Sequence, residues 1–128
     1  MKEKTYSILL VDDDKFLLDM YATKFIEQKF EVTAVFGVAE AVMSLEGGLE
    51  PDIILTDIIM PVSDGFDFLA MLKQRKLAKN SRIIVLSNLG QQEDLEKAKT
   101  LGADGYIVKA TSTPSEVVQK VLEIVEAK

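Results

Sequence analysis

The chain has 128 residues, of which 48% are hydrophobic, and its formal charge at pH 7 is −6. This length predicts a single domain, residues 1–128, large enough for a hydrophobic core of its own. The negative charge argues against broad electrostatic binding to nucleic acid, and no apolar stretch is long enough to predict a membrane span. Histidine and cysteine are absent, which excludes a histidine base or a phosphohistidine in this chain and fits a reducing compartment.

Short apolar runs alternate with segments of helical period along the whole chain. The expected strands cover residues 7–11, 31–36, 53–56, 82–86 and 106–108. The last three are continuously apolar, as strands buried on both faces are, whereas the second alternates and resembles an edge strand. Strands that alternate with helices predict a mainly parallel sheet, and five such units predict a three-layer α/β sandwich.

The helical segments fill the gaps between these strands. The expected helices cover residues 15–28, 38–45, 66–74 and 93–101, and a last helix begins at Pro114. Gly102 stands where a helix commonly ends. Thr113 and Glu116 flank Pro114 with the spacing of a capping box. The apolar face of the last helix is wider than one sheet contact requires, which deep burial and contact with a partner explain equally well.

Two of the apolar runs end in aspartate. Residues 8–11 lead into Asp12, Asp13 and Asp14, and residues 53–56 lead into Asp57. If the two strands are neighbours in a parallel sheet, these carboxylates converge at the edge where open α/β sheets bind ligands. Like charges at close range require a cation or a shared proton. The pattern therefore predicts a divalent metal site, although Asp14 is better explained as a helix cap.

The other strand ends supply further reactive groups. Asp57 is followed by Ile58-Ile59-Met60-Pro61 and then Gly65, which predicts a loop that bends back over the end of its strand. A carboxylate in such a position can attack a phosphoryl donor and form an acyl phosphate. Ser87 and Lys109 end the fourth and fifth apolar runs. Either alone suits a turn or a solvated surface, but together with the acids they predict a site that accepts a phosphoryl group.

This combination resembles a response-regulator receiver domain of two-component signalling, over essentially the whole chain. The matching residues are Asp12-Asp13, Asp57 with Met60-Pro61 and Gly65, Ser87, Lys109 and Leu101-Gly102-Ala103-Asp104-Gly105-Tyr106. The resemblance implies a flavodoxin-like, five-stranded parallel sheet of order 2-1-3-4-5 with five helices. It also implies a cytoplasmic signalling domain, not an enzyme in the usual sense, that either stands alone or was excised from a longer regulator.

The resemblance further implies a role for each residue. Asp57 would accept a phosphoryl group from the phosphohistidine of a sensor histidine kinase, and Ser87 and Lys109 would hold the phosphoryl oxygens. Inward movement of Ser87 would let Tyr106 change rotamer. The face formed by the fourth helix, fifth strand and fifth helix would then bind a downstream protein or a second copy of the chain, without direct contact with nucleic acid or membrane.

The same resemblance implies how a cation would be held. Mg²⁺, or Mn²⁺ in its place, would be bound by Asp13, Asp57 and the main-chain carbonyl of Ile59, with Asp12 acting through water. Mg²⁺ commonly takes one or two carboxylates together with phosphate oxygens and waters.

Four positions near the site modify this picture. Ala110 follows Lys109 where the family usually has a proline, often in a cis peptide; a cis bond before a residue other than proline costs about 2.5–4 kcal/mol, so we expect a trans bond. Asn88 follows Ser87 where the family usually has a small residue, and its side chain could hydrogen-bond into the site or partly block access to it. In the family that this chain resembles, the positions of Ile59 and Leu89 flank the path of the hydrolytic water; because both residues are apolar here, we expect slow loss of the phosphoryl group.

Three other functions fit part of the pattern. Asp12 and Asp14 after a strand also occur in haloacid-dehalogenase-type phosphatases, but Phe16 stands where that motif has threonine or valine. A constitutive interaction module of the same fold would never be phosphorylated. A flavin-binding protein of this fold would need a phosphate-binding loop where this chain has three acids. The residue carrying the covalent phosphate separates the first two from a receiver: Asp57 in a receiver, Asp12 in a phosphatase, none in an interaction module.

Overall fold

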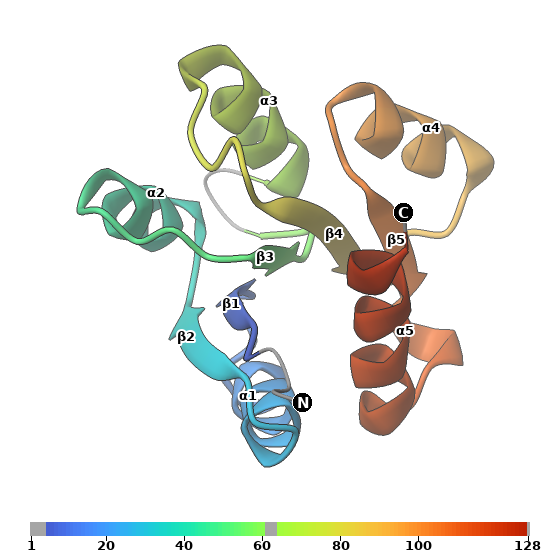
Figure 1. Ribbon diagram of the computed structural model, residues 1–128. Helices are drawn as coiled ribbons and strands as arrows, with labels where there is room; N and C mark the ends of the chain where they lie inside the picture. The colour runs from blue at the N-terminus through green and yellow to red at the C-terminus, as the bar shows by residue number, and fades with distance from the viewer. Residues whose placement is uncertain (1–4, 61–63, 128) are drawn as a thin grey trace.

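The computed structural model describes residues 5–60 and 64–127, which form a five-stranded parallel sheet with helices on both faces (Figure 1). The strands are β1 (Ser7–Val11), β2 (Glu31–Val35), β3 (Ile53–Thr56), β4 (Arg82–Ser87) and β5 (Gly105–Val108). Their order in the sheet is β2-β1-β3-β4-β5, and every neighbouring pair is parallel. The expected α/β sandwich and its strand order are therefore confirmed.

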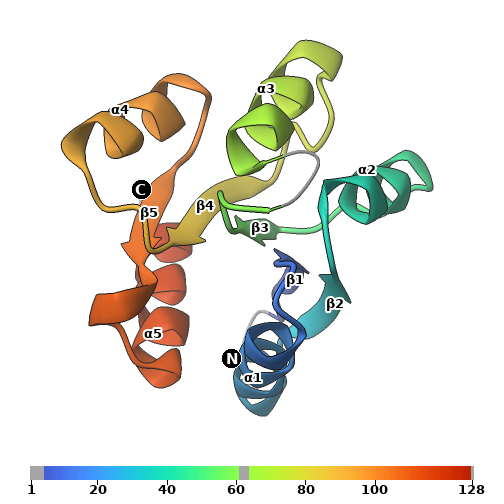
Figure 2. The same ribbon diagram turned by 180° about the vertical axis from the view of Figure 1, so that it is seen from behind.

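The helices divide between the two faces of the sheet. They are α1 (Lys15–Glu27), α2 (Val38–Glu46), α3 (Gly65–Arg75), α4 (Gln92–Thr100) and α5 (Pro114–Glu126), with a short 3-10 turn, η1 (Lys109–Thr111), before α5. α1 and α5 cover one face, and α2, α3 and α4 cover the other (Figures 1 and 2). Each helix lies within two residues of the expected range.

The alternation of side chains along the central strands explains why both faces are covered. In β1, Ile8 and Leu10 pack into the cluster with α1 and α5, whereas Leu9 and Val11 pack into the cluster with α2, α3 and α4. All four side chains are almost fully buried. A strand that is apolar at every position can be stable only where each face is covered by another layer, so the run itself requires the three-layer architecture.

β2 and β5 are the edge strands of the sheet, and the expectation for one of them was wrong. β2 is an edge strand, as its alternation predicted. β5 forms the opposite edge, as the strand order implied by the family resemblance requires, but the burial on both faces that its apolar run predicted is wrong: only Ile107 in it is fully buried, while Tyr106 and Val108 are half-buried. Its apolar composition cannot reveal this position, because the strand order decides which run lacks a second neighbour.

The helix ends agree closely with the capping signals. Asp14 is the N-cap of α1, and its side chain accepts a hydrogen bond from the Leu17 N–H. Thr113 and Glu116 form the expected capping box at the start of α5, and Gly102 adopts a φ of +104° just after α4. A further capping box, between Asp64 and Asp67 at the start of α3, was not predicted.

The wide apolar face of α5 is explained by burial. Val117, Val118 and Val121 are fully buried, and the other apolar residues of the helix are partly buried against the same cluster. Gly105 allows this close approach, because a Cβ built there would lie 2.5 Å from the Cδ1 of Ile124. None of the described helices is long and apolar enough to cross a membrane.

Candidate functional site

The sheet brings the predicted acids together at its carboxyl edge. Val11 of β1 lies beside Thr56 of β3, so the next residues, Asp12 and Asp57, leave the sheet as neighbours. One carboxylate oxygen from each of Asp12, Asp13 and Asp57 lies within 4.8 Å of the others. Asp12 and Asp57 are buried, whereas Asp13 is exposed. The predicted convergence of carboxylates is therefore present, with one acid facing solvent.

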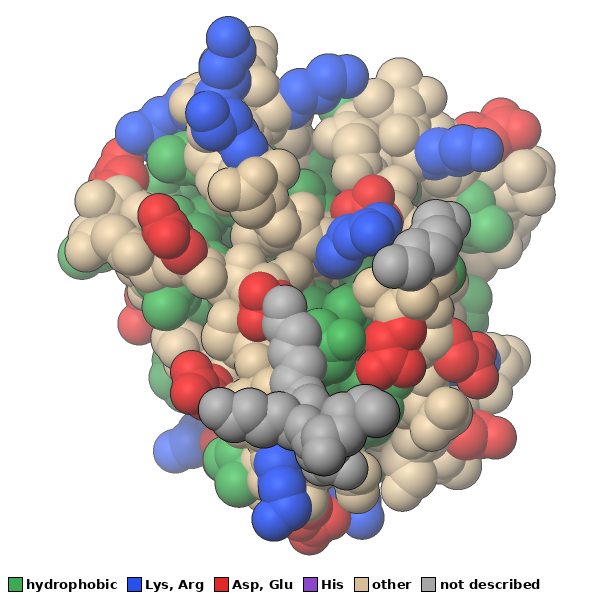
Figure 3. Space-filling model, in the orientation of Figure 1, with side chains coloured by type: hydrophobic (Ala, Val, Ile, Leu, Met, Phe, Trp, Pro, Cys, Tyr) green, Lys and Arg blue, Asp and Glu red, His purple; other side chains and the backbone are tan. Residues whose placement is uncertain are grey.

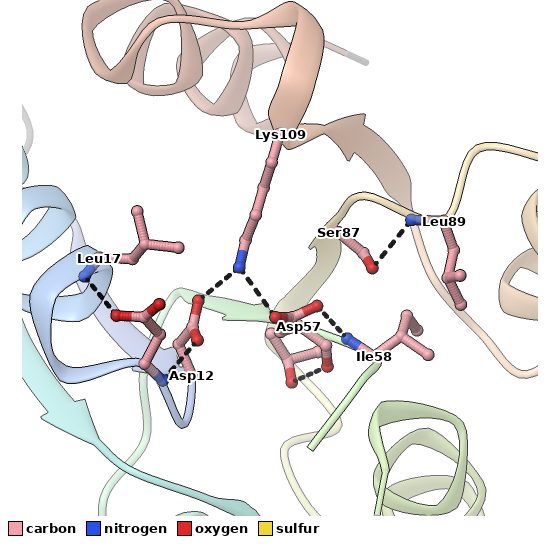
Figure 4. A network of polar contacts seen from close by, with 9 residues as sticks. Asp12, Leu17, Asp57, Ile58, Ser87, Leu89 and Lys109 are labelled. Atoms are coloured by element: carbon pink, nitrogen blue, oxygen red, sulfur yellow. Dashed lines mark hydrogen bonds and ion pairs between the residues drawn. The ribbon is translucent and has the colours of Figure 1, made fainter.

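Lys109 provides the counter-charge for this group. Its Nζ lies 2.8 Å from Oδ2 of Asp12 and 2.8 Å from Oδ2 of Asp57, and its side chain is only 8% exposed (Figure 4). No cis peptide bond occurs among the described residues, so the bond from Lys109 to Ala110 is trans as expected. The ammonium thus reaches both carboxylates without the proline that is usual at the next position.

The buried charges shift the pKa values of these groups in ways that follow from their surroundings. Burial raises the pKa of Asp12, and the hydrogen bond from Lys109 only partly opposes this. Burial by itself would lower the pKa of Lys109, but its bonds to Asp12 and Asp57 outweigh burial and raise it. The ammonium therefore stays charged while it lies between the two acids.

The loop after β3 presents Asp57 through main-chain contacts. Oδ1 of Asp57 accepts a hydrogen bond of 2.7 Å from the Ile58 N–H, and the Gly65 N–H donates to the Ile58 carbonyl at 2.7 Å. A Cβ at Gly65 would lie 2.2 Å from the main-chain oxygen of Asp57, so only glycine lets α3 begin this close to the site. Pro61, which was expected to shape this loop, lies outside the described residues.

Ser87 and Tyr106 are connected through the loop after β4. Ser87 is fully buried on the side of Asp57 away from Asp12 (Figure 4), and its Oγ accepts a hydrogen bond of 3.3 Å from the Leu89 N–H. The Tyr106 hydroxyl donates to the Leu89 carbonyl at 2.5 Å. Burial, helped by the charge of Asp94, raises the pKa of the Tyr106 phenol. The main chain of Leu89 therefore joins the two predicted switch residues.

The side chains expected to modify the site face different surroundings. Ile59 is 61% exposed, Leu89 is half-buried and Asn88 is exposed. Their expected effects on hydrolysis and access stay predictions.

Two residues near the site were not predicted to belong to it. Tyr21 of α1, interpreted from its helical spacing as a core residue, lines a small cavity together with Asp12 and Asp57. The hydroxyl of Thr56 is buried and donates to the main-chain oxygen of Asp57 at 2.9 Å. The only sequence signal for either is a hydroxyl within an otherwise apolar run, and this is too common to identify a site.

Comparisons with known proteins agree with this arrangement. A family model described as the response regulator receiver domain matches residues 8–122. The chemotaxis protein CheY of Halobacterium salinarum is 36% identical over 110 residues, which cover 84% of this chain and 88% of that protein. The response regulator SaeR of Staphylococcus aureus is 34% identical over 114 residues, but these cover only 48% of SaeR. The chain thus spans about half the length of that second relative.

Solved structures show the same fold. The receiver domain of the Francisella response regulator 1452 superposes with a TM-score of 0.84 at 29% identity, covering 95% of this chain and 98% of that one. The chemotaxis response regulator CheY4 of Vibrio cholerae gives a TM-score of 0.85 at 24% identity, covering 94% of this chain and 99% of that one. At that identity, the second comparison supports the fold alone.

Proposed function

The chain belongs to the response regulator receiver domain family of two-component signalling, and we therefore propose that Asp57 accepts a phosphoryl group from a sensor histidine kinase in the cytoplasm. One observation carries the proposal: Lys109 bridges Asp57 and Asp12 at 2.8 Å, with Asp13 close enough to share a ligand with both. A carboxylate held between an ammonium and a candidate cation site is suited to receive a negatively charged group.

The transfer that we propose is a displacement at phosphorus. An oxygen of Asp57 forms a bond to phosphorus while the bond from phosphorus to the donor imidazole nitrogen breaks, and that nitrogen keeps the electron pair and gains a proton from solvent. The product is an acyl phosphate. Lys109, already at Asp57, would move its contact to a phosphoryl oxygen, and the buried Ser87 hydroxyl would donate to another.

The three acids fit a divalent cation of the Mg²⁺ type. Mg²⁺ prefers oxygen ligands and keeps several waters, and the exposed Asp13 leaves one side of the group open to solvent. We propose that Asp12, Asp13, Asp57 and the Ile59 carbonyl hold Mg²⁺ or Mn²⁺, with Asp12 acting through water. The ion would supply neutralisation of the charge on the phosphoryl oxygens.

We further propose that Ser87 and Tyr106 transmit the change to a partner. Ser87 accepts a hydrogen bond from the Leu89 N–H, and Tyr106 donates one to the Leu89 carbonyl. A shift of Ser87 toward a phosphoryl oxygen would therefore move Leu89 and disturb the hydrogen bond that holds the Tyr106 hydroxyl. The face of α4, β5 and α5 would then bind a downstream protein or a second copy of this chain. A change in association state after addition of beryllium fluoride and Mg²⁺ would support this output.

The central test uses a small phosphodonor, acetyl phosphate, with Mg²⁺, followed by mass spectrometry of the intact protein and of its peptides. We expect a gain of one phosphoryl group on Asp57, its absence in Asp57→Asn, and normal labelling in Asp14→Asn, which alters only the helix cap. Label on Asp12 would indicate a phosphatase-type nucleophile, and no label on any acid would indicate an interaction module; either result contradicts the proposal.

A further inference from the structure

A hollow lies at the amino edge of the sheet, opposite the acidic site, between the ends of α3 and α4 and the start of β4. Its volume is about 380 Å³, which is within the range of pockets that bind small molecules. We call it the basic pocket; its lining includes Leu72, Leu77, Leu101, Lys73, Lys76 and Lys79. It is separate from the residues proposed to accept a phosphoryl group.

The walls of the basic pocket combine an apolar surface with positive charge. Leu72 is buried, Leu77 and Leu101 are half-buried, and the three lysines are exposed. The only acid among the lining residues is Asp104, and its carboxylate already accepts a hydrogen bond of 2.8 Å from the Ile83 N–H. A ligand in the pocket would therefore meet an apolar wall and a net positive charge.

This positive charge is unusual for the chain. The whole protein has a formal charge of −6, yet residues 73–82 contain five basic residues and no acid. Arg75 is paired with Glu46, but in the described part of the chain neither Lys76 nor Lys79 forms a salt bridge. Figure 3 shows Lys and Arg side chains gathered over the part of this face where α3 and α4 lie. Within residues 5–60 and 64–127, Lys76 and Lys79 at the pocket thus have no acidic partner.

The third lysine is held at the rim by the helix across the pocket. The Nζ of Lys73 donates to the carbonyl of Thr100, the last residue of α4, at 3.2 Å. The turn beyond α3 is formed by two residues with positive φ, Lys76 at 56° and Ala78 at 54°. Single left-handed residues other than glycine cost about 1–2 kcal/mol each, so this turn is maintained against local strain.

We propose that the basic pocket binds a small organic anion whose apolar ring lies against the leucines and whose phosphate, sulfonate or carboxylate group lies among Lys73, Lys76 and Lys79. An uncharged apolar ligand would leave the lysines unused, and a bare inorganic anion would leave the apolar wall uncovered. Charge and apolar surface together select a ligand that carries both.

The test is a titration with anilinonaphthalene sulfonate, an apolar anion, followed by its fluorescence and by amide chemical shifts of the folded full chain. N-phenylnaphthylamine, the same ring system without the sulfonate, and inorganic phosphate serve as the two half-ligands. We expect saturable binding of the sulfonate, shifts centred on Leu77, Ile83 and Leu101, and affinity roughly tenfold or more above that of either half-ligand.

Two triple variants with the same change in net charge provide the control. Lys73→Gln/Lys76→Gln/Lys79→Gln should weaken sulfonate binding by roughly tenfold, whereas Lys24→Gln/Lys29→Gln/Lys120→Gln should leave it within about twofold. Circular dichroism of both variants must match the parent, because this dye also binds partly unfolded protein. The proposal is overturned if the dye does not bind, if both triple variants bind it alike, if the uncharged analogue binds as tightly, or if the shifts lie elsewhere.

Discussion

Lys109 is the residue on which the acidic site most depends. It is the cation that contacts both buried carboxylates, Asp12 and Asp57, and all three side chains are at least nine-tenths buried. Charges buried to this degree are tolerated only when they are paired. The same contact that would hold a phosphoryl oxygen therefore also stabilises the resting protein.

Lys109→Met should lower the free energy of unfolding by about 3 kcal/mol without divalent cation, because removal of one partner leaves two buried carboxylates uncompensated. Added Mg²⁺ should restore part of this loss. Urea unfolding in EDTA measures the loss of stability, and urea unfolding in Mg²⁺ measures how much of it is restored. Lys24 forms an exposed ion pair with Glu27, so the control variant Lys24→Met should lose less than about 1 kcal/mol of stability. Equal losses in the two variants would contradict the proposed role of Lys109 in compensating the buried carboxylates.

Ile59 and Leu89 lead to a prediction about the lifetime of the phosphorylated state. Neither side chain can orient a water molecule, and Ile59 is exposed beside the site. Ile59→Asn combined with Leu89→Glu should speed the loss of the phosphoryl group about tenfold, which corresponds to about 1.4 kcal/mol in the barrier. The decay of phosphorylated protein in excess Mg²⁺ measures this, with the exposed Met43→Gln as control; a double variant that decays no faster than the parent rules the idea out.

At the scale of elements, the start of α3 shows how packing and site geometry are coupled. The helix begins with a capping box directly beside the Asp57 loop, and Gly65 leaves no room for a side chain. A helix that begins this close to the reactive acid fixes the main chain that presents it. Glycine is therefore required at position 65 because any side chain would collide with the main chain of Asp57. Its backbone conformation does not require glycine, since its φ is not in the left-handed region.

Gly65→Ala should destabilise the protein by about 1–3 kcal/mol, because overpacking forces the backbone to shift, and it should slow labelling of Asp57 by acetyl phosphate. Gly90→Ala is the matched control, since a Cβ there would make ordinary contacts of 3.7 Å with Val108. Thermal unfolding and the labelling rate are the measurements. A Gly65→Ala protein as stable and as reactive as Gly90→Ala would show that the close approach is unimportant.

The capping box of α5 leads to a pH-dependent prediction. Hydrogen bonds from the main chain and side chain of Thr113 lower the pKa of Glu116. A carboxyl group with a lowered pKa stabilises the folded state above its unfolded pKa, and this contribution is lost as pH falls through the folded pKa. Glu116→Gln keeps the hydrogen-bonding groups without the charge, so it should be less stable than the parent at neutral pH and equal to it below the folded pKa.

Urea unfolding of the two proteins as a function of pH measures this difference. Glu123→Gln, on the exposed side of the same helix, removes the same charge away from the capping box and serves as the control. A constant difference between parent and Glu116→Gln at all pH values would contradict the role of the ionised carboxylate.

At the scale of the whole molecule, the charge is unevenly distributed. The carboxyl edge of the sheet collects Asp12, Asp13 and Asp57, while the basic segment of residues 73–82 lies toward the opposite edge. A chain of formal charge −6 thus has one end suited to a cation and another suited to an anion. Ligands of opposite sign are expected at opposite ends of the same sheet.

Cation binding at Asp12, Asp13 and Asp57 should stabilise the whole fold, because these acids come together only in the folded chain. A ligand that binds only the folded state adds about 2.7 kcal/mol at a hundred times its dissociation constant, so Mg²⁺ should raise the melting temperature and Asp13→Asn should remove most of that rise. Asp19→Asn, on the exposed face of α1, should leave it intact. A melting temperature that does not depend on Mg²⁺ in the parent would contradict the proposed cation site.

Local patterns in the sequence were enough to place the helices, the strands and the reactive groups at the strand ends. Apolar runs, helical period and capping residues were sufficient for all five strands and helices, because these signals are local. Other facts appear only in the folded chain: Tyr21 and Thr56 border the site, Lys109 bridges two acids, and Gly65 is confined by the Asp57 main chain. These facts depend on which segments become neighbours across the sheet, and that is set by packing of the whole chain.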